Sequence, residues 1–251
     1  MSILSSLNSF NSVSLEDLDS VKLMNRIDVK FAFNINKLPE LLADLLPFYN
    51  VLSISGQKIQ SYRSLYYDTN DRIFYLNHHN ERVNRHKVRF REYIGSGISF
   101  LEVKLKNNKG KTVKKRIPVD SIPNKLGAKH KDFIIQTIGK EISLFPQQWI
   151  YFDRLTFVDK MFTERLTIDL NLKCSILSSS DNFENIVIAE VKKDKSTSSS
   201  QFSKLAKKYH ILPTRISKYC LSTMSLNPDV KKNRFKKKLL LINKIQQESW
   251  T

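Results

Sequence analysis

Residues 85–106, RHKVRFREYIGSGISFLEVKLK, alternate charged and apolar side chains on both sides of a short turn at Gly95–Gly97. Because side chains alternate faces along a β-strand, this pattern predicts a hairpin in which each strand has an ionic row and a mostly apolar row. The ionic rows contain Arg85, Lys87, Arg89, Arg91, Glu102, Lys104 and Lys106. Such rows are either a solvated surface or the lining of an interior.

The same two-row pattern recurs in other parts of the chain, in residues 25–35, 60–71, 111–120, 150–173 and 184–194. On these ionic rows cations greatly outnumber anions. The cations are Arg26, Lys30, Arg63, Arg85, Lys87, Arg89, Arg91, Lys104, Lys106, Lys114, Arg116, Arg154, Arg165 and Lys192, and the anions are Asp28, Glu102, Asp169 and Glu190. A solvated face would mix its signs to limit repulsion, so this one-sided set indicates a surface that binds a polyanion.

Helical patterns with apolar stripes are interleaved with these strands, in residues 36–49, 129–145 and 201–211. Such helices need apolar surface to cover, and the apolar rows of the strands supply it. We therefore expect an α+β fold, a closed antiparallel eight-stranded β-barrel with a polar cationic lumen and helices packed outside. For any single strand, a sandwich with its ionic row in water is the alternative.

One domain is expected over residues 1–251, with a core at about 22–222 and a basic C-terminal helix in 223–251. The 42 Lys and Arg against 24 Asp and Glu give a net charge of +18, which suggests a polyanionic partner: nucleic acid, anionic lipid or a phosphate-rich small molecule. The basic C-terminal helix is interpreted as a solvated covering helix, with contact to acidic lipid or a partner subunit as the alternative.

The two cysteines, Cys174 and Cys220, do not indicate a disulfide framework, and a reducing cytosolic setting is the default. The N-terminus has no basic segment followed by an apolar core, and no uninterrupted apolar run reaches about 18 residues. We expect a cytoplasmic protein. Location at the inner face of a membrane, through a membrane-protein partner subunit, stays open.

An ordered set of short motifs resembles the polyphosphate polymerase domain of the vacuolar transporter chaperone (VTC) family, within the CYTH-like triphosphate tunnel metalloenzymes. The set covers about residues 26–219 and reads RIDVKF, YRSLYYDTND, RHKVRFREY, FLEVKLK, KTVKKR, YFDR, ERLTID, AEVK and SKY. The resemblance implies a tunnel that binds ATP with Mn²⁺ or Mg²⁺ and transfers the terminal phosphoryl group to a growing polyphosphate chain. ATP and polyphosphate are then the expected partners.

The resemblance also implies roles for individual residues. Those nearest the chemistry are Lys30, Arg89, Arg91, Lys104 and Lys192, and the further phosphate-binding cations are Arg63, Arg85, Lys114, Arg116, Arg154, Arg165 and Lys218. Glu190 is the implied principal metal ligand and Glu102 the second. A structural ion pair with Lys192 or Arg165 is the competing interpretation of Glu190.

Two further functions stay open at this point. Many tunnel hydrolases and cyclases begin with a Glu-x-Glu-x-Lys strand, where this chain has Arg26, Asp28 and Lys30, so the sequence favours chain extension over a triphosphatase. A non-catalytic module that binds polyphosphate or nucleic acid is the other alternative. Nucleic acid is not expected, because aromatic residues are not interleaved on the basic faces.

Other residues with functional chemistry are given structural roles. His78 and His79 are adjacent, with no carboxylate or cysteine at metal-ligand spacing, and are expected at the surface. Tyr66, Tyr67 and Tyr93 are interpreted as packing residues of strands, with stacking on a base as the alternative.

Overall fold

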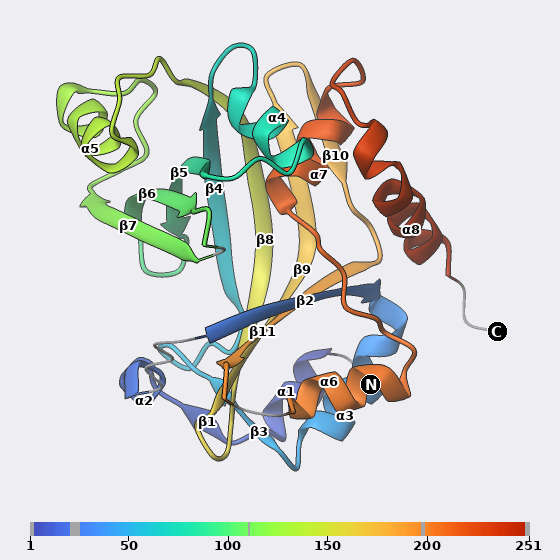
Figure 1. Cartoon of the computed structure of the whole chain (residues 1–251). Helices are drawn as coiled ribbons and strands as arrows, with labels where there is room; N and C mark the ends of the chain where they lie inside the picture. Colours follow the sequence, from blue (N-terminus) through green and yellow to red (C-terminus); the bar gives the residue numbers. More distant parts are fainter. Residues whose placement is uncertain (1–2, 21–25, 110, 197–198, 249–251) are drawn as a thin grey trace.

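The computed structural model describes residues 3–20, 26–109, 111–196 and 199–248. A strongly curved sheet runs through the molecule, in the strand order β2-β11-β9-β8-β4-β5-β6-β7 (Figure 1). Its strands are β2 (Arg26–Asn34), β4 (Gln60–Asp68), β5 (Arg85–Tyr93), β6 (Ile98–Lys106), β7 (Thr112–Val119), β8 (Phe145–Asp159), β9 (Glu164–Ile176) and β11 (Ile186–Asp194). All neighbours along this order are antiparallel, as predicted.

Short strands extend this sheet, and helices cover it. The short strands are β1 (Ser12–Val13), β3 (Tyr49–Leu52) and β10 (Ser179–Asn182). The helices are α1 (Ile3–Asn8), α2 (Leu15–Ser20), α3 (Leu38–Leu45), α4 (Ile73–His79), α5 (Ala128–Ile138), α6 (Gln201–Lys208), α7 (Lys218–Leu226) and α8 (Lys236–Gln247), with 3-10 turns η1 (Ile35–Lys37) and η2 (Asn233–Phe235). The start of the predicted core at residue 22 lies outside the described residues.

The outer face of β2, β11, β9 and β8 is covered by α1, α3 and α6 (Figure 1). Helix α3 buries all four of its leucines there, Leu38, Leu41, Leu42 and Leu45, because their spacing places them on one stripe. The helix ends just before Pro47, which cannot continue it. The helix predicted in residues 36–49 is thus confirmed in its central part.

The outer face of β4, β5 and β6 is covered by α5. Val88, Phe90, Leu101 and Val103 form the apolar rows of the quoted hairpin and pack with Ile134 of the helix. Helix α5 ends at Gly139, whose φ of 84° is the left-handed conformation that glycine adopts without cost. The predicted helix 129–145 is therefore too long, since its last residue already begins β8.

The ionic rows lie on the concave, inner face of the sheet. Lys104 on β6 and Glu190 on β11 belong to strands separated by four others, yet the charge of Glu190 acts to raise the pKa of Lys104. Lys30 on β2 similarly acts to lower the pKa of Lys87 on β5. These side chains approach one another only if the sheet curls around its ionic face, which confirms the predicted interior lining.

The sheet does not close into the expected barrel. Within the described residues, β7 and β2 end the strand order without pairing with each other. Residues 211–217, named here the connecting segment, cover the free edge of β2: the Thr214 amide donates to the Lys30 carbonyl at 2.6 Å, and Pro213 forms a β-bridge with Phe31. The other edge strand, β7, contains Pro118, which cannot donate a ladder hydrogen bond.

One end of the inner face is apolar and filled by α7 and α8. Inner-face residues of five strands, Ala32, Tyr66, Ile150, Leu172 and Ile188 among them, form one buried cluster with the two helices. A buried network fixes α7: the Gln148 side chain donates to the Tyr219 carbonyl at 3.0 Å, and the Tyr219 hydroxyl to Asp68 at 2.5 Å. The two helices therefore close this end of the inner face.

The histidine pair lies on α4 and is not a surface pair. His79 is fully buried, and its Nδ1 lies 2.9 Å from the Asn80 side-chain oxygen, while Nε2 accepts the Arg234 amide at 3.3 Å. His78 is partly buried beside Phe235.

In the described part of the chain, no helix has the length and apolar character needed to span a bilayer.

Candidate functional site

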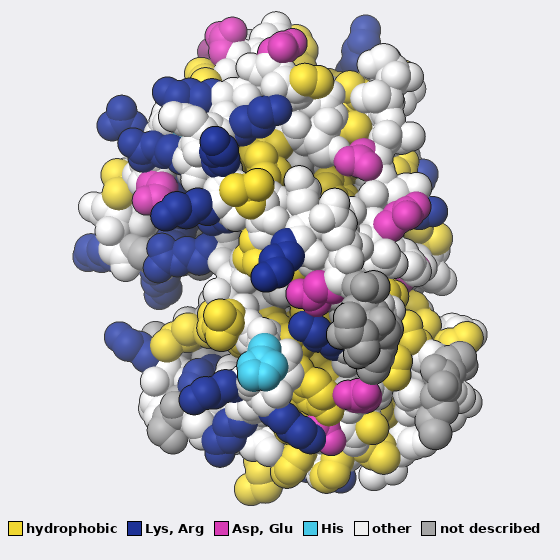
Figure 2. Space-filling model, turned by 90° about the vertical axis from the view of Figure 1, so that its right-hand side faces the viewer, with side chains coloured by type: hydrophobic (Ala, Val, Ile, Leu, Met, Phe, Trp, Pro, Cys, Tyr) yellow, Lys and Arg dark blue, Asp and Glu magenta, His cyan; other side chains and the backbone are white. Residues whose placement is uncertain are grey.

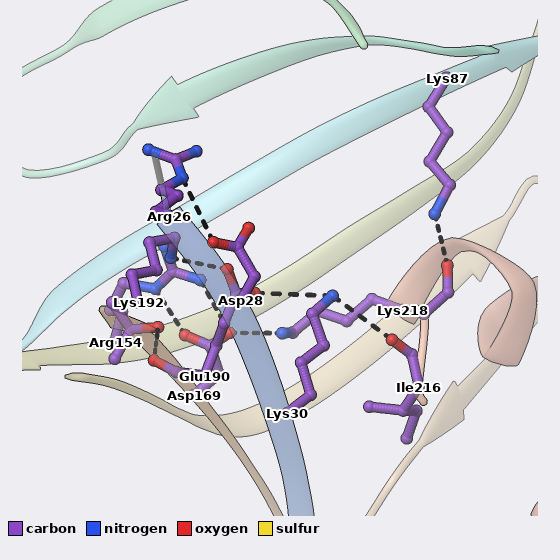
Figure 3. A network of polar contacts seen from close by, with 12 residues as sticks. Arg26, Asp28, Lys30, Lys87, Arg154, Asp169, Glu190, Lys192, Ile216 and Lys218 are labelled. Atoms are coloured by element: carbon purple, nitrogen blue, oxygen red, sulfur yellow. Dashed lines mark hydrogen bonds and ion pairs between the residues drawn. The ribbon is translucent and has the colours of Figure 1, made fainter. Parts of the chain in front are cut away.

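The first group of charged residues on the inner face is centred on Asp169 of β9 (Figure 3). Its carboxylate is 3% exposed and accepts two hydrogen bonds from Arg154, at 2.6 and 2.8 Å, and one from Lys218. Burial alone would raise the pKa of Asp169, but the charges of Arg154 and Lys218 lower it well below its usual range. Asp169 thus holds two cations in fixed positions on the inner face.

Glu190 lies beside this group, on β11. It pairs with Lys192 at 2.7 Å and with Lys30 at 3.5 Å, and its side chain keeps 20% of its surface exposed (Figure 3). Burial would raise its pKa, but the charges of Lys192 and Lys30 lower the pKa well below the ordinary value. Glu190 is therefore ionised and, in contrast to Asp169, in contact with solvent.

A second group is centred on Glu102 of β6. Its carboxylate is fully buried and pairs with Arg89, at 2.7 and 2.5 Å, and with Lys114. Arg89 also donates to the Tyr66 hydroxyl at 2.7 Å. Arg89 and Lys114 enclose Glu102, so its carboxylate already has two cationic partners, and its role as a second metal ligand stays a prediction.

Arg91 and Lys104 lie between these groups and have no acidic partner among the described residues. Arg91 is 8% exposed. Its one hydrogen bond to a described residue runs from its Nε to the Ser64 hydroxyl, at 3.2 Å. Burial and the charge of Arg89 lower the pKa of Arg91 to about 10. Burial and the charges of Arg89 and Arg91 hold the pKa of Lys104 well below its usual value. This arrangement favours an anionic ligand that would supply the missing counter-charge.

Aromatic rings form the floor beneath these cations. The guanidinium of Arg91 lies 5.3 Å from the Tyr62 ring, and the Phe152 ring lies 5.2 Å from Arg154 and 4.8 Å from Lys218. The expectation that aromatic residues avoid the basic face is therefore wrong. Since cations already cover these rings, they stabilise the cations and do not offer free platforms for a base.

The VTC domain family matches residues 25–227, most of the chain. The chain belongs to the VTC domain family. No curated protein matches it. Among solved structures, a putative adenylyl cyclase from Hippeastrum, HpAC1, described as having a dominant triphosphatase activity, is 15% identical, with a TM-score of 0.49 over 80% of this chain and 96% of that one. The PH1012 protein from Pyrococcus horikoshii OT3 is 8% identical, with a TM-score of 0.40 over 73% and 88% of the two chains.

Most of the cations expected in the site of this VTC domain do share its inner face. Family membership and this cation-rich face together support a tunnel-fold protein that acts on phosphate compounds. The inner-face set comprises Lys30, Arg85, Arg89, Arg91, Lys104, Lys114, Arg116, Arg154, Arg165, Lys192 and Lys218. Arg165 lies at the far end of this set, where it donates to the Leu18 carbonyl of α2. Arg116 stacks on Phe100 at 4.4 Å near the open edge.

Arg63 is the exception, because it lies on the outer face. On β4, Tyr62, Ser64 and Tyr66 contact the inner-face arginines, so the intervening Arg63 points the other way. It pairs with Glu92 at 2.5 Å and lies 5.5 Å from the Trp149 ring. The prediction that Arg63 shares the ionic row is therefore wrong, and Arg63 is not a phosphate ligand of this face.

Three inner-face residues had no assigned site role in the sequence interpretation. Asp169 lies on the predicted ionic row, but its pairing with Lys218 links two segments that are far apart in the sequence. Lys87 was also on the row, and it donates to the Ser217 hydroxyl at 2.8 Å. Phe152 could have been found from the YFDR motif, because it lies two residues before Arg154 and so on the same face.

The described residues contain no group of three or more His, Cys, Asp or Glu side chains that could hold a metal ion. Glu190 offers one ionised, partly exposed carboxylate to the lumen. Mg²⁺ and similar ions commonly bind through one or two carboxylates and complete their coordination with substrate phosphates and water. The donor set therefore fits a divalent ion that arrives with a phosphate ligand, and Glu190 is the residue that would hold it.

Lys104→Met is expected to stabilise the unliganded protein and to weaken tripolyphosphate binding about tenfold, the worth of one charge-assisted contact. Folding lowers the pKa of Lys104, so the folded chain binds fewer protons than the unfolded chain. The free energy of unfolding should therefore rise with pH up to the ordinary lysine pKa of about 10.4, and the variant should reduce that rise.

The measurement is urea unfolding across this pH range, together with titration calorimetry of tripolyphosphate. Lys106→Met is the matched control, because Lys106 lies on the same row of β6 but is exposed at the strand end. Equal effects of the two substitutions would show that Lys104 is an ordinary surface lysine.

Proposed function

We propose that this VTC domain is a metal-dependent polyphosphate polymerase that transfers the terminal phosphoryl group of ATP to a growing polyphosphate chain. The observation that carries the proposal is a pair of cations, the buried Arg91 and the partly buried Lys104, that have no acidic partner among the described residues. They lie on a face that also presents the ionised Glu190. A linear polyphosphate supplies the negative charge that these residues lack. Family membership supports the same chemistry.

The inner-face cations bind and orient the phosphates. Arg91 and Lys104 are free to contact phosphate oxygens, and Arg89 is held rigid by Glu102 and Tyr66. Phosphoryl transfer needs mainly positioned reactants and neutralised equatorial oxygens, and such preorganised cations supply both. Across the lumen, Lys30 and Lys192 flank Glu190 and would contact the same phosphates.

The acceptor needs no dedicated general base, because the end of a polyphosphate chain is already an anion at neutral pH. A divalent ion bound with the substrate at Glu190 would add charge neutralisation of the transferred group. Arg26 and Asp28 form an exposed ion pair at 3.2 Å on β2, so this strand offers one carboxylate where Glu-x-Glu-x-Lys enzymes have two. This difference supports chain extension over hydrolysis.

A triphosphatase is the second candidate, and the position of α7 favours it. Because α7 and α8 fill one end of the inner face, a product chain cannot pass straight through the molecule. A short triphosphate that binds from the open side and is hydrolysed there needs no such passage.

The expected cytoplasmic location and the membrane-protein partner subunit stay predictions.

Incubation of the purified protein with ATP and Mn²⁺, followed by ³¹P NMR and gel analysis of the products, tests the proposal. Long-chain polyphosphate together with ADP is the expected result. Orthophosphate as the sole phosphate product would instead identify a triphosphatase. Absence of ATP turnover, with polyanion binding retained, would mean that the domain is a binding module.

A further inference from the structure

A small hollow of about 20 Å³ lies outside the lumen, behind the connecting segment. Its walls come from α4, the connecting segment, α7, η2 and α8, and its lining residues include His78, Arg215, Ser217, Phe235 and Lys238. The lining contains no aspartate or glutamate. The polar part of this hollow is therefore basic.

More cations adjoin the hollow from β5. The positive charges of Arg85, Lys87 and Lys238 all act to lower the pKa values of two lining residues, His78 and Cys220. Burial and the charges of Lys87, Arg85 and Lys238 together lower the pKa of His78 to about 2, so its imidazole is neutral. The positive charge around the hollow thus comes from Arg85, Lys87, Arg215 and Lys238.

None of these four cations forms an ion pair in the part of the chain that the structure describes. Lys238 lies 4.9 Å from the Phe235 ring, and Lys87 donates to Ser217. On the inner face, by contrast, Glu102 and Asp169 each pair with two cations. An ordinary solvated surface would mix its signs, whereas this cluster leaves its charge uncompensated.

The hollow and the lumen are neighbours that share the connecting segment as a wall. On the lumen side, Lys30 donates to the Ile216 carbonyl at 3.4 Å and Lys87 to the Ser217 hydroxyl at 2.8 Å (Figure 3). Lys87 is also the cross-strand partner of Lys104, and Arg85 follows it on the same row of β5. A row of cations therefore leads from Lys104 in the lumen to the rim of the hollow.

The basic surface continues beyond the hollow onto α8. No acidic residue occurs from 230 to 247, and Lys236, Lys237 and Lys244 are exposed there. Figure 2, which views the side that carries α8, shows many Lys and Arg side chains towards the left of this face, and some Asp and Glu side chains at its top. The row is longer than a triphosphate needs, and it is suited to a linear polyanion of greater length.

We propose that Arg85, Arg215 and Lys238 form an outer binding site for linear polyphosphate, which holds the phosphates distal to the chain end in the lumen. The inference rests on the proposed function for the identity of the polyanion. The outer site binds chains that reach from the lumen around the connecting segment, and it does not contact ATP or tripolyphosphate bound among Arg91 and Lys104. Affinity therefore increases with the length of the chain.

The test compares the affinities of wild type and of Arg215→Gln/Lys238→Gln for tripolyphosphate and for long-chain polyphosphate, by titration calorimetry at one salt concentration. For the variant we expect about tenfold weaker binding of the long chain, equivalent to the loss of about 1.4 kcal/mol, and unchanged binding of tripolyphosphate. Lys129→Gln/Lys131→Gln is the matched control, because it removes the same charge from the exposed surface of α5.

The results separate this inference from the proposed function. Equal long-chain affinities of wild type and variant, or equal losses in the variant and the α5 control, would overturn the outer site even if ATP turnover is confirmed. A selective loss of long-chain binding supports the outer site even if wild type makes no polyphosphate from ATP. A parallel loss of tripolyphosphate binding would place Arg215 and Lys238 in the lumen site and contradict a separate outer site.

Discussion

Glu190→Gln is expected to lower manganese-dependent ATP turnover by about a thousandfold without unfolding the protein. Glu190 is ionised and 20% exposed, while Glu102 is enclosed by its partners and Asp169 is almost fully buried. The amide keeps the size and shape of the side chain but removes the negative charge that would hold a divalent ion. Such an ion contributes several kcal/mol to transition-state stabilisation, and about 4 kcal/mol corresponds to a factor of a thousand.

The measurement is the initial rate of ADP formation at several Mn²⁺ concentrations, with circular dichroism as the test of folding. Glu92→Gln is the matched control, because Glu92 pairs with Arg63 at 2.5 Å on the outer face of the same sheet. The control should keep its rate. Full activity of Glu190→Gln in a folded protein would refute the metal assignment and leave Glu190 as a structural ion-pair partner of Lys192.

Asp169→Asn is expected to lower the free energy of unfolding by about 3 to 5 kcal/mol. Arg154 and Lys218 are 18% and 16% exposed, and Asp169 is the carboxylate that both of them contact. The amide leaves these two partly buried cations without a counter-charge. Lys218 begins α7, so the same substitution weakens the attachment of α7 to the inner face.

The pH dependence of stability provides a second readout. Folding lowers the pKa of Asp169, so its contribution is fully present above the pKa of an ordinary aspartate, about 3.9, and is lost as the pH falls towards the lowered pKa. The stability difference between wild type and Asp169→Asn should therefore shrink below this pH. Urea unfolding of both proteins between acidic and neutral pH measures this difference in the free energy of unfolding.

Two further variants distinguish a buried charge cluster from ordinary surface pairing. Asp169→Asn/Lys218→Met removes one of the two uncompensated cations and should recover part of the lost stability. Asp44→Asn breaks an exposed pair with Lys208, 2.7 Å long, and should cost about 1 kcal/mol or less. If Asp169→Asn costs no more than Asp44→Asn, the Asp169 group does not hold α7 in place.

Local patterns determined the elements that the sequence predicted well. Val88 and Phe90 alternate with Arg89 and Arg91, so the two faces of β5 follow from the period of a strand. The four leucines of α3 follow in the same way from the period of a helix. The excess of cations over anions on the ionic rows also indicates, without any knowledge of contacts, that these rows line an interior.

Patterns on separate strands could not be aligned with one another from the sequence. On β4, aromatic residues lie on both faces, Tyr62 and Tyr66 inward and Tyr67 outward, so its alternation does not identify the inner side. Its pairing with β8 also shifts register between Tyr66 and Tyr67. The sequence of β4 therefore does not determine the face on which Arg63 lies, and the cross-strand contact with Glu92 decides it.

The sequence by itself determined that this chain builds a curved sheet with a basic inner face, because alternation and charge are local properties of each strand. Only the tertiary structure decided which carboxylates are enclosed, as Glu102 is by Arg89 and Lys114, and which one stays accessible, as Glu190 does. It also decided that α7 fills one end of the inner face and that the connecting segment covers the edge of β2. These features depend on contacts between residues far apart in the chain, which no local period of the sequence encodes.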